Sequence, residues 1–447
     1  MRPRGDHFDM MNMPIDFDAN TDEILQRALS LYRHERDPIQ ALESEKSEML
    51  RHLDVPGMNT AVAICFWGRS GSYLLASYLD GHEDIVTLPM IAGEKIYPFF
   101  EEYASLSLWE KLIAYPTYSG LKKGVEAAFF EGDFAIASAD YYAAIHALFA
   151  VFRDCPATWL GARLRFFQFL HAAYALATGV RSRSGRPIMI YAQHWPNDAL
   201  AQRFVEDFPT ARFIHTIRDP ISSFDSWYER SLEMQLYSAG RGSDTPSHYL
   251  SSAVECVRHL CRWDRAHDGM EARTRAIRFE DLHLAPEMTM RRLVNWLGIP
   301  YLPCLIESTW HRIPYVVKVR GVDVCGPNPA NAQRRWKNLF FADRLLIFAL
   351  MHDNFVAWNY PIPTWIRARW IRLGVTVLCL LVPMKMELIN ARLVLRLQAW
   401  PSLRRGRIRF FCGAPIFLLT RRLRMMLLIA AEAYARLTGR RTPLTML

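Results

Sequence analysis

The sequence predicts an α/β protein with a doubly wound, mostly parallel sheet. Between residues 61 and 300, short apolar runs alternate with stretches of helical pattern. Fully apolar strands separated by helices are typical of a parallel sheet that is covered on both faces. The chain has 447 residues, of which 51% are hydrophobic, so it can bury one large core or two smaller ones.

The elements follow in a simple order along the chain. Residues 1–55 are polar and end in a helix that we expect to begin at Asn20, whose side chain can cap it while Glu23 reaches back. We interpret them as an N-terminal helical extension. The five strands that follow are AVAICFW (61–67), DIVTLP (84–89), PIMIYA (187–192), ARFIHTI (211–217) and TRAIRF (274–279). Residues 104–180, rich in Ala, Phe and Tyr, predict a helical insertion within a domain at 56–360.

Positive charge is concentrated in a C-terminal tail, residues 361–447. This tail holds sixteen Lys and Arg residues against Glu387 and Glu432, a net charge of +14, whereas the whole chain carries +9. Residues 1–360 are therefore net negative, at −5. The asymmetry indicates an anionic partner for the tail and argues against a nucleic-acid partner for the body.

The tail is apolar in short runs only. Its longest uncharged runs, 373–384 and 410–420, fall short of the about 20 residues needed to span a bilayer. Pro383, Pro401 and Pro415 are expected to break it into short amphipathic helices. Arginine clusters beside aromatic and leucine-rich stripes favour helices that lie on an anionic membrane surface. The alternative is that they pack on the catalytic body or on a second subunit.

Cysteine usage indicates a reducing environment. The eight cysteines are scattered, with no C-x-x-C and no paired Cys/His spacing, and the first residues contain no apolar run of signal-peptide length. These patterns predict a reduced, cytoplasmic chain without structural zinc.

The stretch FWGRSGSYLL, residues 66–75, joins the first strand to a predicted helix. Ligands bind at this edge of an open α/β sheet, and the helix directs backbone N–H groups at an anion. Gly71 permits close approach, Ser70 and Ser72 offer hydroxyls, and Arg69 adds a fork of donors. Together these residues suit a phosphate or sulfate. The lysine that a nucleotide P-loop carries after its last glycine is missing. The alternative is an ordinary strand-to-helix turn with a surface arginine.

A second motif follows the fourth strand in FIHTIRDPISSFDSWYERS, residues 213–231. Arg218 ends the strand, Pro220 is suited to the first turn of a helix, and Ser226 follows eight residues after the arginine. Arg218 and Ser226 could hold a second phosphate from two sides. Alone, the motif also fits a helix start with a local ion pair.

Together the two motifs resemble those of the sulfotransferases that use 3′-phosphoadenosine 5′-phosphosulfate. The resemblance covers about residues 58–360 and includes RFEDLHLAPEMTMRRLVNWLGIP (278–300) and RRWKNLF (334–340). It implies that Arg218 and Ser226 hold the 3′-phosphate of the donor. It assigns the 5′-phosphosulfate to Arg69, Ser70, Gly71, Ser72 and Tyr73, although Tyr73 stands where the family usually has a second small hydroxyl residue.

The same resemblance implies in-line sulfuryl transfer, in which positioning and charge stabilisation dominate. Arg69 would neutralise charge on the bridging oxygen, and no metal is expected. The acceptor hydroxyl needs a base at the same sheet edge. Glu94 follows the second strand, as in related carbohydrate sulfotransferases, and His194 follows the third; of the two, Glu94 is favoured. Alternatively, Glu94 pairs with Lys95 and His194 is an ordinary loop histidine.

The predicted function is sulfuryl transfer from this donor to a carbohydrate hydroxyl, on a glycolipid, a lipo-oligosaccharide or a polysaccharide. The predicted location is the cytoplasmic face of the membrane, with peripheral attachment through the tail. Two alternatives belong to other classes. One is a non-catalytic, membrane-associated adaptor with a vestigial nucleotide site, and the other is a nucleotide kinase, which the missing Gly-Lys-Ser/Thr disfavours.

Overall fold

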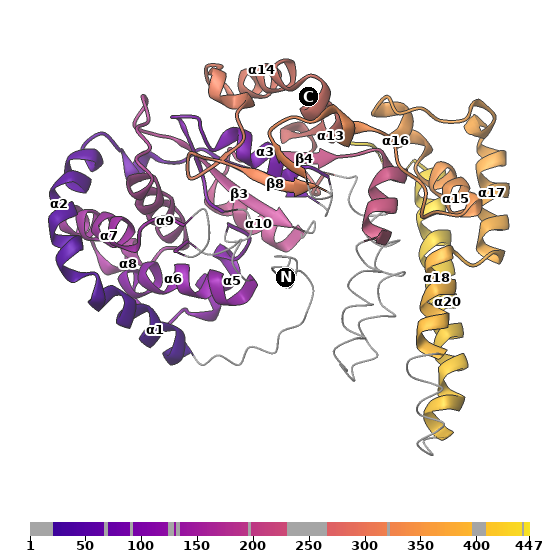
Figure 1. The fold of residues 1–447 in the computed structure, drawn as a ribbon, viewed down its shortest axis with the longest axis horizontal. Coiled ribbons are helices and arrows are strands. Elements are labelled where there is room, and N and C mark those ends of the chain that lie inside the picture. The colour runs from indigo at the N-terminus through magenta and orange to yellow at the C-terminus, as the bar shows by residue number, and fades with distance from the viewer. Residues whose placement is uncertain are drawn as a thin grey trace.

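The central feature of the computed structural model is a sheet of five parallel strands in the order β2-β3-β1-β4-β5 (Figure 1). The structure describes residues 21–66, 70–89, 93–123, 129–130, 135–194, 198–229, 266–319, 322–395, 408–439 and 442–447. The strands are β1 (Ala61–Phe66), β2 (Ile85–Thr87), β3 (Ile188–His194), β4 (Arg212–Ile217) and β5 (Thr274–Arg278). All five predicted strands are present, and the predicted α/β class is confirmed.

The strand order places a change of direction beside β1. After β1 the chain crosses to β2 at one edge of the sheet, and after β4 it moves to β5 at the other edge. Where connections diverge in this way, the carboxyl ends of the strands leave a crevice in which ligands bind. β1 and β4 are neighbours at that point, and one of the two anion motifs follows each of them.

Helices cover both faces of the sheet, as alternation along β1 requires. Ala63 and Cys65 belong to the larger core cluster, whereas Ile64 and Phe66 belong to the cluster on the opposite face. The larger cluster is formed with α5 (Ile96–Glu102), α6 (Leu108–Lys123), α7 (Ser138–Phe152), α9 (Arg163–Ala177) and α10 (Asp198–Asp207). The opposite cluster is formed with α3 (Ser72–Leu79), α13 (Phe279–Leu284) and α14 (Pro286–Leu297).

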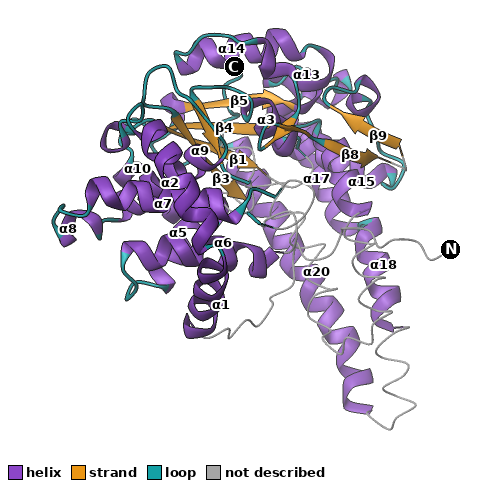
Figure 2. Cartoon of the chain, turned by 60° about the vertical axis from the view of Figure 1, so that its left-hand side comes forward, coloured by secondary structure: helices purple, strands orange, loops and turns teal. Residues whose placement is uncertain are grey.

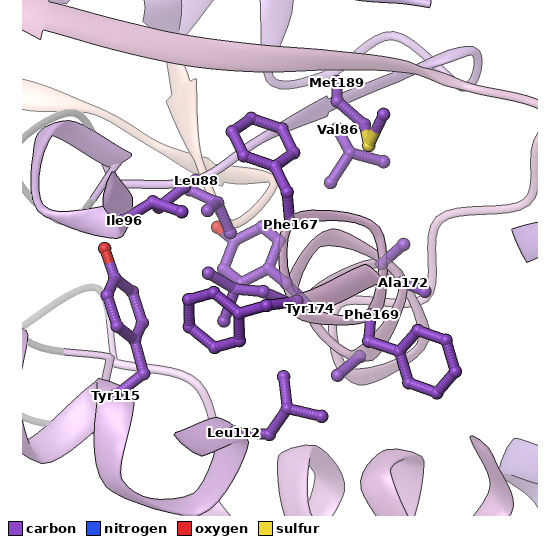
Figure 3. Packing of buried hydrophobic residues seen from close by; sticks show 14 of the residues in the cluster. Val86, Leu88, Ile96, Leu112, Tyr115, Phe167, Phe169, Ala172, Tyr174 and Met189 are labelled. Carbon is purple, nitrogen blue, oxygen red and sulfur yellow. The ribbon is translucent and has the colours of Figure 1, made fainter. Parts of the chain in front are cut away.

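The larger cluster is dominated by aromatic rings. Figure 3 shows Phe167 and Tyr174 of α9 lying between the strand residues Val86 and Met189 and the side chain of Leu112 from α6. Residues 104–180, predicted to be mostly helical, form α6, α7, α9 and the short α8 (Ala157–Leu160). This layer walls one side of the sheet.

The N-terminal helices lie on the outside of that layer (Figure 1). They are α1 (Thr21–His34) and α2 (Arg36–Leu50). The buried ammonium of Lys46 in α2 lies 2.6 Å from the carboxylate of Asp140 in α7. The predicted cap residue, Asn20, lies outside the described residues, and the helix begins at Thr21.

Short elements connect the sheet to its surroundings. The 3-10 turns are η1 (Val55–Gly57), η3 (Glu271–Arg273), η4 (Pro303–Ile306), η5 (Pro329–Ala332) and η6 (Thr364–Arg367). Two antiparallel pairs follow α14, namely β6 (Thr309–Trp310) with β7 (Ile313–Pro314), and β8 (Val316–Val319) with β9 (Val322–Cys325).

The C-terminal region is helical. It contains α15 (Phe341–Leu350), α16 (His352–Ala357), α17 (Arg369–Leu381), α18 (Lys385–Val394) and α20 (Ile408–Leu437). Figures 1 and 2 show α18 and α20 side by side, extending away from the sheet, and Arg422 of α20 lies 2.6 Å from Glu387 of α18. None of the helices in the described part of the chain is both long enough and apolar enough to span a membrane.

One expectation for this region is wrong. Pro415 lies inside α20, which continues for 30 residues, so it does not divide the tail into shorter helices at that point. A proline removes one backbone hydrogen bond, and the many other hydrogen bonds of so long a helix maintain it. Pro383 does lie between α17 and α18, as expected, and Pro401 lies outside the described residues.

The end of the chain returns to the sheet. Ala276 of β5 donates its N–H to the carbonyl of Thr445 at 2.8 Å, and its own carbonyl accepts from the N–H of Leu447 at 3.0 Å. The side chain of Leu444 is buried in a third core cluster that contains Met425 of α20 and Trp358. The tail therefore packs on the body through part of its length.

Candidate active site

The two anion motifs meet at the carboxyl edge of the sheet because of the strand register. Phe66, the last residue of β1, is paired with His194 of β3 and with Thr216 of β4. The loop after β1 therefore begins between the ends of its two neighbours. Arg69, the arginine of the first motif, lies outside the described residues, as do residues 67 and 68.

The described part of the first motif is tightly packed. The buried hydroxyl of Ser70 lies 2.8 Å from the hydroxyl of Thr216, which joins the first loop to β4. Gly71 has a φ of 88° at the N-cap of α3, a conformation that favours glycine. A Cβ atom there would lie 2.5 Å from Cδ2 of Phe279. This position therefore requires glycine for two independent reasons.

The two residues after Gly71 open helix α3. Ser72 is buried and is the first residue of the helix. Tyr73 is half-buried, and its ring makes edge-on contacts with Phe66 and Trp310, with centroids 6.4 and 6.5 Å apart. The larger residue that departs from the family pattern is thus accommodated by aromatic packing.

The second motif also contacts Phe279. The guanidinium of Arg218 lies over the ring of Phe279 at 4.5 Å and is 6% exposed. Burial lowers the pKa of Arg218; the Glu280 carboxylate opposes this shift, and the nearby Arg335 guanidinium adds to it. Ser226 lies half-buried on the helix of residues 220–229, which opens with Pro220 as predicted.

The segment of residues 334–340, which is distant in sequence, is hydrogen-bonded to this helix. The N–H of Arg335 donates to the Ser222 hydroxyl at 2.9 Å, and the N–H of Asn338 donates to the Asp225 carboxylate at 2.7 Å. The Arg334 guanidinium lies 2.7 Å from the Asp219 carboxylate. The RRWKNLF segment therefore adds positive charge next to Arg218.

Glu280 is hydrogen-bonded to the turn that carries the second motif. Its carboxylate accepts a hydrogen bond from the N–H of Asp219 at 3.1 Å and another from the hydroxyl of Tyr360 at 2.6 Å. Burial raises the pKa of Glu280, and the hydrogen bond from Tyr360 opposes that rise. Such buried contacts hold the turn after β4 in one position.

The two candidate bases belong to or lie near β3, which flanks β1 on the side opposite β4. Glu94 is 13% exposed and lies 3.8 Å from the ammonium of Lys95, so the predicted alternative pairing is present at long range. Burial and the nearby Glu94 carboxylate raise the pKa of the Tyr191 phenol, which places Glu94 beside β3. His194 is the last residue of β3, and its side chain lies outside the described part of the structure.

Sequence reasoning did not identify Phe279, Glu280 or Tyr360 as parts of this site. Phe279 and Glu280 do lie in the RFEDLHL segment, whose resemblance to the family was the available signal. Arg334 and Arg335 likewise lie in the segment that resembles the end of the domain. The positions of all these residues depend on contacts between segments far apart in the sequence, and the spacing within a motif does not reveal such contacts.

The chain matches a known protein family. A model described as the sulfotransferase family matches residues 61–303. No curated protein matches. Among solved structures, the sulfotransferase domain from the curacin biosynthetic pathway is 15% identical, with a TM-score of 0.36, and the match covers 68% of this chain and 99% of that one.

Two further solved structures are similar to this chain at a comparable level. The sulfotransferase domain from the Synechococcus PCC 7002 olefin synthase is 16% identical, with a TM-score of 0.32, and the match covers 70% of this chain and 99% of that one. Sulfotransferase STF9 from Mycobacterium avium is 11% identical, with a TM-score of 0.29, and the match covers 60% and 70% respectively.

Proposed function

The chain belongs to the sulfotransferase family, and we propose that it transfers a sulfuryl group from 3′-phosphoadenosine 5′-phosphosulfate to a carbohydrate hydroxyl. One observation carries the choice of donor. Gly71 of the first motif and Arg218 of the second both lie against the ring of Phe279. A donor with anionic groups on both the 3′ and the 5′ oxygen of one ribose needs two anion sites close together, and we assign one to each motif.

The charges near the second motif support a bound anion there. Burial disfavours the charge of Arg218; the Glu280 carboxylate offsets part of this cost, and the neighbouring Arg335 adds to it. A phosphate between such cations would remove that repulsion and form charge-assisted hydrogen bonds. At the first motif, the start of α3 directs backbone N–H groups toward a second anion.

The proposed reaction is an in-line displacement. The acceptor oxygen forms a bond to sulfur while the bond from sulfur to the bridging oxygen breaks, and adenosine 3′,5′-bisphosphate leaves. We assign Arg69 to the charge that develops on the bridging oxygen. The acceptor proton passes to Glu94, or to His194 as the second candidate.

The acceptor class rests on the tail and on the family resemblance. Exposed apolar side chains follow helical spacing on α20, at Ile416, Leu419, Leu423 and Leu427. A second row on α17 includes Trp370, which is 76% exposed. Apolar helix faces with many arginines nearby favour an anionic membrane surface, and we propose a glycan carried on or near it as the acceptor.

The test is transfer of radiolabelled sulfate from the donor by the purified full-length protein. We expect label in a lipid-extractable or polysaccharide fraction of membranes supplied as acceptor. At low donor concentration, Arg218→Ala should strongly reduce the transfer, whereas Arg291→Ala, at a surface arginine paired with Glu287, should not. Tight binding of adenosine 3′,5′-bisphosphate without transfer to any acceptor would instead support the non-catalytic adaptor.

A further inference from the structure

Three buried side chains form a row across the sheet, one residue before its carboxyl edge. Cys65 of β1 is paired with Gln193 of β3 on one side and with His215 of β4 on the other. All three are at most 1% exposed. Their side chains share one face of the sheet, and the Cys65 thiol donates to Oε1 of Gln193 at 3.3 Å.

His267 closes over this row. Its Nδ1 lies 2.8 Å from Oδ1 of Asp198, the first residue of α10, so that carboxylate fixes the orientation of the ring. Its Nε2 lies 3.1 Å from Oε1 of Gln193 and 3.9 Å from Sγ of Cys65. The ligand-type atoms of Cys65, His215 and His267 all lie within 4.8 Å of one another.

The contacts bring several lone pairs to one point. When Nδ1–H of His267 donates to Asp198, Nε2 of the neutral ring presents a lone pair to its surroundings. It then faces the carbonyl oxygen of Gln193, which is also an acceptor. A cation between these atoms would be stabilised by both of them and by the sulfur of Cys65.

The separations fit a metal coordination shell. Tetrahedral zinc has Zn–S bonds of about 2.3 Å and Zn–N or Zn–O bonds of about 2.0–2.2 Å, which place neighbouring ligand atoms about 3.4–3.6 Å apart. The separations among Sγ, Nε2 and Oε1 are 3.1, 3.3 and 3.9 Å. Among these three atoms, shifts of a few tenths of an ångström would reach that geometry, and the ring nitrogen of His215, within 4.8 Å of Sγ and Nε2, would move closer to them.

We propose that Cys65, His215 and His267 bind a Zn²⁺ ion, with the Gln193 oxygen at a fourth position. A thiolate with two imidazoles is a ligand set that zinc prefers. Asp198 is the carboxylate partner that metal-bound histidines commonly have. The proposal departs from the expectation of no structural zinc, because the ligands come from three separate elements and have no paired spacing in the sequence.

A thiol, an imidazole and a carboxylate in line also occur in cysteine hydrolases. A nucleophile must meet its substrate, however, and the Cys65 side chain is 0% exposed in the middle of the sheet. The geometry therefore favours a bound ion over a nucleophile.

The ion would have a structural role that does not depend on the proposed reaction. It would join β1 and β4 to His267, which lies shortly before β5 in the chain. Cys65 shares its sheet face with the larger core cluster, whereas α3 and the loop that opens it pack on the other face. Metal content can therefore be measured whether or not sulfuryl transfer occurs.

The test is the metal content of the full-length protein, purified without metal-affinity steps and analysed by elemental mass spectrometry. We expect about one zinc per chain, as for a single site. Cys65→Ser and His267→Asn should lose it. The matched controls are Cys379→Ser, at a buried thiol of the tail, and His171→Asn, at a buried histidine bonded to two backbone carbonyls; both should retain it.

A fifth variant separates loss of the metal site from loss of the fold. The Asp198 side chain is 50% exposed, so Asp198→Asn should leave the core intact while weakening zinc affinity about 10–100-fold in a chelator competition. Cobalt added to the metal-free protein should give a thiolate-to-metal absorption band that Cys65→Ser lacks. Absence of metal and of this band in the natural sequence would overturn the proposal, as would full zinc retention in Cys65→Ser. The buried side chains would then be an ordinary hydrogen-bonded part of the core, in which the side-chain N–H of Gln193 donates to Nε2 of His267.

Discussion

Phe279 is the residue that unites the proposed donor site. It limits position 71 to glycine on one side and supports the guanidinium of Arg218 on the other. A rigid ring in this place holds the two anion motifs at a fixed separation, which positioning of an extended donor requires. The effects of single substitutions near it can therefore be assigned to one end of the donor or to the other.

Arg218→Ala tests the assignment of the 3′-phosphate. The substitution should weaken binding of adenosine 3′,5′-bisphosphate by about 1.5–3 kcal/mol, the range for a hydrogen bond to a charged group. Binding of adenosine 5′-phosphate, which lacks the second phosphate, should change far less. Calorimetry with both ligands measures the difference, and equal losses for the two would remove the assignment.

Glu94→Gln tests the proposed base. The amide preserves the shape of the side chain but accepts no proton, so turnover should fall by about 10² to 10⁴. Donor affinity should remain as it is, because Glu94 lies beside Tyr191 and we assign it to the acceptor and not to the donor. Steady-state kinetics with a fixed acceptor measures both quantities. Near-normal turnover in this variant, together with loss in His194→Ala, would transfer the role to the histidine.

At the scale of elements, α20 combines two surfaces. Met425, Ile429 and Ala433 are buried in a core cluster, while the stripe that includes Leu423 and Leu427 is exposed. A helix needs one apolar face to pack on the body, and α20 has a second one facing outward. Exposed apolar stripes of this kind mark surfaces that meet a membrane or another protein.

Leu423→Glu tests whether this stripe meets lipid. Binding of the full-length protein to anionic vesicles should weaken strongly, because an apolar contact is lost and a repulsive charge is added. Val151→Glu makes the same kind of change at an exposed apolar residue of α7, outside the tail, and should weaken binding less. Vesicle sedimentation at rising salt concentration separates the Coulomb contribution. A full-length protein that ignores lipid charge would remove the membrane proposal.

At the scale of the whole molecule, the chain closes on itself. Residues 442–447 extend the sheet beside β5, and Trp358 donates its indole N–H to the carbonyl of Leu444 at 3.1 Å. The tail is thus anchored at both ends, by the packing of α17 on α15 and by this final segment. A cut at residue 361 would remove part of a core, so substitutions are the better way to examine the tail.

Leu444→Ala measures the contribution of this closure. Leu444 is 4% exposed within the cluster that contains Trp358 and Ile429, so truncation should lower the free energy of unfolding by about 2–5 kcal/mol. Thr442→Ala, at an exposed position two residues earlier, should have little effect. Urea unfolding of the two variants makes the comparison. An equal midpoint for both would mean that the terminal segment adds nothing to the fold.

The sequence by itself determined the five strands, their parallel class and the positions of both anion motifs. These features are local, since an apolar run or a turn such as Arg-Asp-Pro is specified by adjacent residues. The left-handed Gly71 and the helix that starts at Pro220 follow from the same short-range chemistry. Most of the candidate donor site could therefore be named before any contact was known.

Only the tertiary structure decided which distant residues complete those motifs. Phe279 meets Gly71, and Leu444 meets Trp358, across long stretches of chain, and no local pattern specifies such pairs. The same is true of Cys65 and His267, whose approach depends on strand register and on the helix that orients the ring. Helix α20 continues past a proline because many hydrogen bonds act together. Packing of the whole chain selects these contacts, since their free energy becomes available only when both partners are already in place.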